Sequence, residues 1–339
     1  MSTLWDTTGG EVVKALGAER RAAGAVAFGL VLTLVVIVDE RHASEAMAAA
    51  ADGAAAHPCR LLVVVRRQLD AAEPRLDAEV SVGGRLGTGE SVVLRMHGPL
   101  GRHAESVVLP LLAPDTPVVT WWFGAPPERI VDDCLGALAD RRITDIAAAP
   151  DPVAALEQRA ADYSPGDTDL AWTRITTWRS LLAVALDSVP GTPTDGRVEG
   201  EPGNPSARLL AGWLSARLGI AVPAETSKGP GLTAVALSFD GEEGGAVHLD
   251  RPDGRNARLT RTGLPDRLLP LPRRQLGDLI GEELRRLDPD EPYGDALAAA
   301  AGRPVRQPEP GGGVERRPTA LERQGEEAAG RRLGSGASA

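Results

Sequence analysis

The chain has 339 residues, of which 42% are hydrophobic and 25% are charged, and its formal net charge at pH 7 is -10. These proportions are typical of a globular protein with about two domains. Nucleic-acid binding depends on clustered Lys and Arg that displace counterions from phosphates, so a net negative chain opposes it. We therefore expect no nucleic-acid partner.

The two cysteines, Cys59 and Cys134, are too few and too far apart for a disulfide framework or a zinc site. This usage favours a reducing, cytoplasmic environment. Cys59 leads into an apolar run and is expected to behave as a small buried hydrophobe. The acidic neighbours of Cys134 disfavour a thiolate. Whether either thiol is redox-active stays open at this point, and no cofactor or metal is expected.

Residues 22–38 are strongly apolar and follow Arg20 and Arg21, a pattern that also occurs in membrane signal anchors. The stretch contains two glycines and is short for a membrane span of about 20 residues. Its second part, residues 30–38, is rich in Val, Leu and Ile. It predicts a strand buried on both faces of a mostly parallel sheet. We favour the strand and expect no membrane association.

Residues 1–150 alternate between helical and strand patterns, which predicts an α/β N-terminal domain with a mixed, mostly parallel sheet. The pair at 76–82 and 91–96 flanks a glycine-rich loop, from Gly83 to Gly89, and predicts a β-hairpin. The remaining elements, in chain order, are helix 11–22, strand 30–38, helix 43–56, strand 60–66, helix 102–112, strand 117–123 and strand 143–148.

Residues 151–189 are expected to form a helical connector, whose second helix carries an apolar stripe containing Ile175, Trp178 and Leu182. Residues 190–302 predict a smaller α+β C-terminal domain. A turn-rich break at 190–196 precedes a helix that begins at Asn204 and Pro205 and ends at Gly219. Strands are expected at 233–239, 246–250, 256–261 and 267–271, and a closing helix with Leu276, Ile280, Leu284 and Leu287 is expected to cover one face of the sheet.

Residues 303–339 are rich in Pro, Gly, Arg and Glu without apolar periodicity, and we expect this tail to be disordered.

The sequence contains no recognisable catalytic constellation. Its five histidines fall outside the known hydrolase and zinc motifs. The Gly83 to Gly89 loop is followed by neither a Lys-Ser/Thr pair nor a helix, so phosphate binding there is not favoured. We expect a protein that is not an enzyme.

The segment 165–179 is the strongest candidate for recognition. It concentrates Trp and Arg, which dominate binding hot spots, in a chain with only 3% aromatic residues. Core packing of the tryptophans is an equally open interpretation. For the aspartates, helix capping or pairing with arginine is favoured over metal binding. Adjacent Trp121 and Trp122 point to opposite faces of a strand, so one of them is expected to leave the core. The predicted partner-binding residues are Trp121, Trp122, Asp167, Asp169, Trp172, Arg174, Trp178 and Arg179.

Several stretches together resemble the glucose-6-phosphate dehydrogenase assembly protein family, OpcA. They are residues 29–35, 57–60, 106–112, 115–122, 165–179, 204–206, 229–235 and 282–289, and the resemblance covers roughly residues 4 to 302. It implies a non-catalytic factor that binds glucose-6-phosphate dehydrogenase and promotes its active oligomer or conformer in the oxidative pentose phosphate pathway. The alternative is a sugar-phosphate-binding protein or enzyme that uses Arg174 and Arg179 as anion ligands.

Overall fold

The computed structural model describes residues 1–24, 29–55, 57–83, 89–241 and 244–305. The chain divides into two compact units, and each is described by itself. Unit 1 contains Met1–Ile143 and the returning segment Ile280–Asp288. Unit 2 contains Thr144–Leu279 and the described residues from Pro289 onward. The stretch 151–189, expected as a separate connector, lies within unit 2, and most of the expected tail, residues 306–339, lies outside the described residues.

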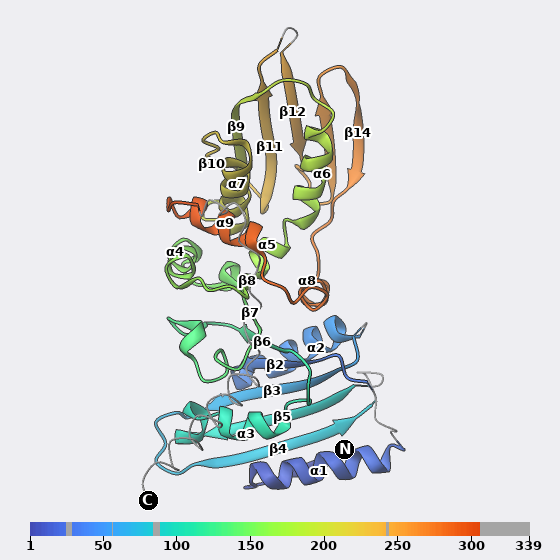
Figure 1. Cartoon of the computed structure of the whole chain (residues 1–339), viewed down its shortest axis with the longest axis vertical. Helices are drawn as coiled ribbons and strands as arrows, with labels where there is room; N and C mark the ends of the chain where they lie inside the picture. Colours follow the sequence, from blue (N-terminus) through green and yellow to red (C-terminus); the bar gives the residue numbers. More distant parts are fainter. Residues whose placement is uncertain (25–28, 56, 84–88, 242–243, 306–339) are drawn as a thin grey trace, which may run out of the picture. The chain divides into compact units, whose positions relative to one another are not determined.

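Unit 1 is built on a mixed sheet with helices against it (Figure 1). Its strands are β1 Ser2–Leu4, β2 Leu32–Val38, β3 Cys59–Arg67, β4 Arg75–Val82, β5 Glu90–His97, β6 Val118–Phe123 and β7 Arg141–Thr144, whose last residue begins unit 2. Its helices are α1 Gly9–Ala22, α2 Ala43–Ala54 and the short α3 Glu105–Val108. Short 3-10 turns are Glu40–His42, Gly98–Arg102, Leu109–Leu111 and Ile130–Asp132.

The strand order within this unit is β1-β4-β5-β3-β2-β6-β7. β2 pairs in parallel with β3 on one side and β6 on the other, while β4 and β5 form the predicted antiparallel hairpin. All seven residues of β2 are buried, which explains their continuous apolar character. The prediction of a strand rather than a membrane anchor is confirmed for these residues. No helix among the described residues has the length and apolar character needed to cross a membrane.

Trp121 and Trp122 differ from the expectation that one of them leaves the core. They are 1% and 2% exposed. Trp122 belongs to the main apolar cluster of unit 1, together with residues of α1 and the sheet. Trp121 makes an edge-on contact with Phe123 at 5.4 Å between ring centroids. Alternation along the strand does place the two rings on opposite faces, but both faces are covered at this position.

Two predicted elements of unit 1 are wrong in form. The helix expected at 102–112 is interrupted: Arg102 ends a 3-10 turn, α3 covers only Glu105–Val108, and a second 3-10 turn follows over Leu109–Leu111. Pro110 lacks the backbone N–H that would continue α3. The strand expected at 143–148 is β7, Arg141–Thr144, followed by the 3-10 turn Ile146–Ala148. Asp145 ends the extended run by accepting a hydrogen bond from the backbone N–H of Ala147.

Unit 2 contains a second, six-stranded sheet in the order β10-β9-β11-β12-β13-β14. Its strands are β9 Pro193–Gly200, β10 Ala224–Thr226, β11 Leu232–Phe239, β12 Gly245–Asp250, β13 Asn256–Arg261 and β14 Leu264–Pro270. All neighbours are antiparallel except β10 and β9. Its helices are α4 Pro152–Asp162, α5 Leu170–Thr173, α6 Thr176–Leu186, α7 Pro205–Leu218 and α9 Glu291–Ala300, and the short strand β8 Asp167–Asp169 precedes α5.

Helices α6 and α7 lie against this sheet, α6 over β12 and α7 over β9 (Figure 1). The predicted ends of α7 are confirmed: the Asn204 side chain caps Ala207 N–H, and Gly219 follows the helix with a left-handed φ of 69°.

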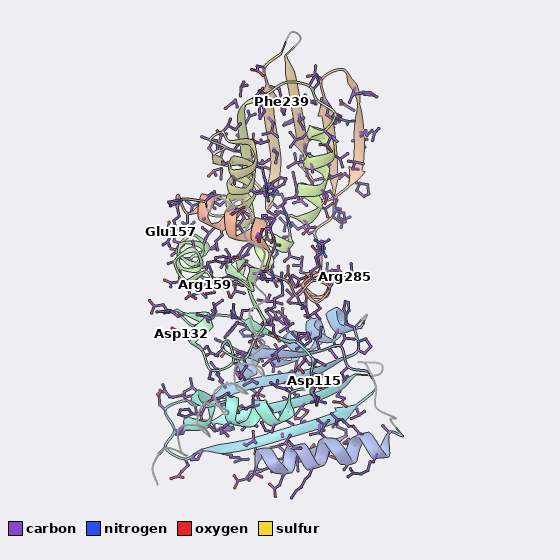
Figure 2. The ribbon with its side chains drawn as sticks, viewed as in Figure 1. Asp115, Asp132, Glu157, Arg159, Phe239 and Arg285 are labelled. Carbon is purple, nitrogen blue, oxygen red and sulfur yellow. The ribbon has the colours of Figure 1, made fainter. Side chains whose placement is uncertain are left out.

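The helix α4 exposes Glu157 and buries Arg159, which is 6% exposed (Figure 2). The predicted α/β and α+β fold classes are confirmed.

Two further expectations for unit 2 are corrected. The turn-rich stretch 190–196 contains the start of β9, where Gly196 leaves room for its neighbour: a Cβ there would lie 2.6 Å from Leu237 Cδ2. The expected closing helix is the shorter α8, Leu276–Glu283, and its second half belongs to unit 1, where Glu283 accepts from Arg141 Nε at 3.0 Å. This contact neutralises the buried charge of Arg141.

Candidate functional site

The segment 165–179 forms a strand and two helices in unit 2. β8 ends at Asp169, which occupies the N-cap position of α5, and its side chain accepts from Ala171 N–H at 2.8 Å. The expectation that an aspartate here caps a helix is confirmed. Asp167 likewise accepts from the backbone N–H of Ser164 at 2.8 Å. Both carboxylates are therefore engaged inside this unit.

Asp169 is a fully buried carboxyl group. Besides Ala171, it accepts from Thr144 Oγ1 at 2.6 Å and from Ile146 N–H at 2.9 Å. Burial and the nearby charge of Asp145 raise the pKa of Asp169 to about 7, although these three donors act in the opposite direction. The charge state of Asp169 therefore depends strongly on its surroundings.

Arg174 forms an ion pair with Asp145, a partner that the sequence interpretation did not include. Two parallel hydrogen bonds join the groups, at 2.6 and 2.7 Å. Burial lowers the pKa of Arg174, but the contact with Asp145 outweighs it and raises the pKa above the ordinary value. The sequence favours Asp167 or Asp169 as the carboxylate that pairs with an arginine of this segment. The structure instead supplies Asp145 from the turn after β7.

The tryptophans of the block are buried, each 1% exposed. Trp172 donates from Nε1 to Asp290 at 2.8 Å, and the guanidinium of Arg179 lies 3.6 Å from the centroid of the Trp172 ring. Trp178 packs in the main apolar cluster of unit 2. A direct role for these residues in partner binding stays a prediction. What the structure adds is that Arg174 and Arg179 are the half-buried members of the set.

Beside this block, unit 2 contains a cavity of about 370 Å³. The first turns of α6 and α7 line it, and so does the loop before α8. Its charged lining residues are Asp145, Arg174, Glu201, Arg251, Arg273 and Arg274. Arg174 reaches this cavity, but Arg179 does not line it, so the two predicted anion ligands do not meet in one site there.

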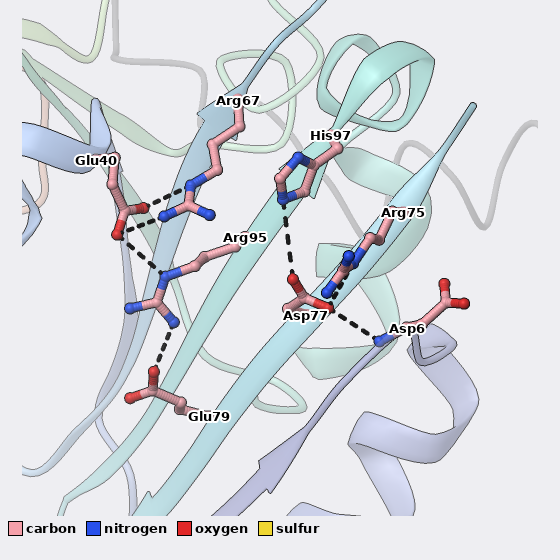
Figure 3. Close-up of polar contacts among 8 residues, drawn as sticks. All are labelled: Asp6, Glu40, Arg67, Arg75, Asp77, Glu79, Arg95 and His97. Atoms are coloured by element: carbon pink, nitrogen blue, oxygen red, sulfur yellow. Dashed lines mark hydrogen bonds and ion pairs between the residues drawn. The ribbon is translucent and has the colours of Figure 1, made fainter. Parts of the chain in front are cut away.

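A second group of charges lies on the sheet of unit 1 (Figure 3). Glu40 follows β2 and accepts from Arg67 at 2.8 Å and from Arg95 at 3.3 Å, and Arg95 also donates to Glu79 at 2.6 Å. These arginines outweigh burial and lower the pKa of Glu40. Because the charges neutralise one another across neighbouring strands, they are best explained as sheet surface pairing.

The thiols lie in surroundings that disfavour ionisation. Burial raises the pKa of Cys59 to about 12. Burial, a hydrogen bond with Glu105 and the charge of Asp133 raise the pKa of Cys134 to about 11. Within the described ranges no three His, Cys, Asp or Glu side chains are grouped as metal ligands would be. Most of the glycine-rich loop, residues 84–88, lies outside the described residues.

Sequence reasoning missed Asp145 and three of the four cavity arginines: Arg251, Arg273 and Arg274. Arg251 follows β12 and the other two precede α8, so they come from distant parts of the chain. Arg251 is a single arginine and Arg273 and Arg274 are an adjacent pair, all in loop sequences that resemble ordinary solvent-exposed turns. No local signal marks them, and only the fold brings them together.

The fold and the site define a two-unit protein: an α/β unit followed by an α+β unit that carries an arginine-lined cavity. Residues 50–161 match the family model described as the glucose-6-phosphate dehydrogenase subunit N-terminal domain, and residues 165–297 match the corresponding C-terminal domain. The chain belongs to the OpcA family, as its sequence resemblance predicts.

Two curated relatives carry the name putative OxPP cycle protein OpcA. The protein from Synechococcus elongatus is 29% identical over 242 residues, which are 67% of this chain and 50% of the relative. The protein from Synechocystis sp. is 27% identical over 280 residues, or 77% of this chain and 55% of the relative. The chain thus spans about half the length of these relatives.

Among solved structures, KijD10, a 3-ketoreductase from Actinomadura kijaniata, aligns over 80% of this chain and 95% of its own, with 11% identity and a TM-score of 0.42. An oxidoreductase from Sinorhizobium meliloti aligns over 79% of this chain and 86% of its own, with 11% identity and a TM-score of 0.30. Likeness at this level carries no argument about activity.

Proposed function

We propose that this chain is a non-catalytic, cytoplasmic partner of glucose-6-phosphate dehydrogenase that promotes the active oligomer or conformer of that enzyme in the oxidative pentose phosphate pathway. One observation carries the proposal: both family models that match the chain are described as domains of a glucose-6-phosphate dehydrogenase subunit. The names of the two cyanobacterial relatives agree with this pathway.

The factor would act by binding the active form of the dehydrogenase more tightly than the inactive form. A bound protein can shift such an equilibrium only by its differential affinity for the two forms. Activation should therefore saturate with added chain. If the chain raises the affinity of the dehydrogenase for its substrate by some factor, the substrate should raise the affinity of the dehydrogenase for the chain by the same factor.

We propose that the contact lies on the outward face of α6, which begins inside the recognition segment 165–179 and continues to Leu186. Thr177 and Ser180 are exposed there, and Val184 is 66% exposed. The same helix carries half-buried Arg179, and arginine is among the residue types that dominate binding hot spots.

The test combines the purified chain with glucose-6-phosphate dehydrogenase from the same organism. We expect a saturable rise in NADP reduction and co-elution of the two proteins, and no turnover of glucose 6-phosphate by the chain alone. Val184→Lys should weaken both effects. Leu268→Lys is the matched control, because Leu268 is 75% exposed on β14, another element of the same unit.

Turnover by the chain alone, without any effect on the dehydrogenase, would refute the proposal. If both lysine variants activated like the unmodified chain, the partner role would stand and the placement on α6 would be wrong.

A further inference from the structure

The cavity of unit 2 has a net positive lining in an acidic protein. Four arginines and two carboxylates line it, whereas the whole chain has a formal net charge of -10. Its volume of about 370 Å³ is large enough for a small metabolite. A concentration of positive charge in a concave site of this size favours a small anionic ligand.

Arg251 is the central observation. Its side chain lines the cavity and is 6% exposed, yet it makes no ion pair within the described ranges. The two terminal nitrogens donate to the backbone carbonyls of Leu271 at 3.0 Å and Leu232 at 2.9 Å. Its Nε is buried without a hydrogen-bond acceptor. The guanidinium carbon also lies 5.1 Å from the centroid of the Trp178 ring, but no carboxylate in the described part of the chain pairs with this buried cation, and a bound anion would supply that charge.

Arg273 stands close enough to Arg251 to act on its charge. Burial and the positive charge of Arg273 both lower the pKa of Arg251. Arg273 is exposed and makes no hydrogen bond to another described residue. Its guanidinium sits over Gly231, where a Cβ would lie 2.9 Å from Nη2. An anion bound between the two arginines would relieve their repulsion.

The neighbouring carboxylates do not neutralise Arg251 and Arg273. Asp145 is engaged by Arg174, and Glu201 accepts from the side-chain amide of Asn204 at 3.1 Å. Asp253, the acidic group that acts on Arg251 from outside the cavity, accepts from the backbone N–H groups of Arg255 and Asn256 at 2.8 and 2.7 Å. Each of these carboxylates has its own donors.

Two helices begin at the cavity. Residues of the first turn of α6, Thr177 and Trp178, and of α7, Pro205 and Ser206, are among its lining. The N-cap position of α6 is Ile175, whose side chain cannot accept a hydrogen bond. Helix N-termini expose N–H groups that favour phosphate and other anions, and here they face the same space as the arginines.

We propose that this cavity binds a phosphate monoester of a small metabolite, with the phosphate group held by Arg251 and Arg273. The apolar lining residues Ile175, Leu232 and Leu271 would contact the organic part. The arginines differ from the pair expected from the sequence, since only Arg174 of that pair reaches the cavity. The inference concerns the chain alone and does not depend on the proposed dehydrogenase partner.

The experiment titrates the full chain with glucose 6-phosphate, inorganic phosphate and glucose by calorimetry, without any dehydrogenase. We expect one saturable site for glucose 6-phosphate, weaker binding of inorganic phosphate and no binding of glucose. Arg273→Gln should weaken glucose 6-phosphate binding about tenfold, the effect of losing one charge-assisted contact. Its melting temperature should not change, because Arg273 is exposed.

Arg251→Gln should abolish binding, and circular dichroism must establish that this variant is folded. Arg258→Gln is the matched control, because Arg258 is exposed on β13 and does not line the cavity. The proposal fails if neither phosphate compound binds saturably, or if Arg273→Gln binds like the unmodified chain. Equal affinity for inorganic phosphate and glucose 6-phosphate would overturn the assignment to a monoester in favour of free phosphate.

Discussion

Arg174 donates from both terminal nitrogens to the two carboxylate oxygens of Asp145, at 2.6 and 2.7 Å. The pair stands next to buried Asp169, whose pKa depends on the charge of Asp145. One arginine therefore neutralises one of two neighbouring acidic groups at the start of unit 2. The free energy of unfolding of unit 2 should therefore depend on the Arg174–Asp145 pair.

Arg174→Ala should lower the free energy of unfolding by about 1.5 to 3 kcal/mol, the range for a hydrogen-bonded charged group that loses its partner. Denaturant unfolding followed by tryptophan fluorescence measures the change. Arg197→Ala is the control: its pair with Glu199 is more exposed, and its loss should cost about 1 kcal/mol or less. Equal losses in the two variants would contradict a special role for the Asp145 pair.

Asp169 should make stability fall as the pH rises from about 4 to 7. Its pKa in the folded chain is about 7, against an ordinary value of 3.8, so in this range the folded state retains a proton that the unfolded state has lost. The slope contributed by this one group is at most about 1.4 kcal/mol per pH unit.

The matched comparison is Asp169→Asn, which cannot titrate. We expect this variant to be less stable overall, because its amide group meets the donors that the carboxylate accepts from. Between pH 4 and 7, however, the free energy of unfolding of this variant should fall less steeply with rising pH, because the contribution of Asp169 is missing. Identical slopes in the two proteins would show that folding does not raise the pKa of Asp169.

Arg179→Ala tests the second arginine of the recognition segment. Its guanidinium lies 3.6 Å from the centroid of the Trp172 ring, so the variant should lose about 0.5 to 2 kcal/mol of stability. If Arg179 also contacts the dehydrogenase, surface plasmon resonance should show faster dissociation. Unchanged dissociation in this variant and in the Arg174→Ala, Arg179→Ala double variant would remove both arginines from the interface.

Both cysteines should react slowly with thiol reagents in the folded chain at pH 7.5. The raised pKa values, about 12 for Cys59 and about 11 for Cys134, leave almost no thiolate at that pH. Labelling with 5,5'-dithiobis(2-nitrobenzoic acid) measures the rate, and the same chain in guanidinium chloride provides the fast reference. Rapid labelling of Cys134 in the folded chain would reopen the question of redox control.

The sequence alone determined the features that depend on local pattern. The apolar run of β2 indicated a strand covered on both faces, and Asn204 with Pro205 placed the start of α7. The aspartate cap at α5 and the β4–β5 hairpin followed from the same kind of evidence. These signals act over a few residues, because burial periodicity and capping are properties of neighbouring positions.

Tertiary structure decided the contacts between distant positions. It assigned Asp145 to Arg174, buried both Trp121 and Trp122, and brought Arg251 and Arg273 to one cavity. An exposed arginine and a buried one look alike in sequence, since the guanidinium is charged in both settings and only its surroundings differ. Which acceptor an arginine meets depends on how the elements pack, and that information is absent from any short stretch of the chain.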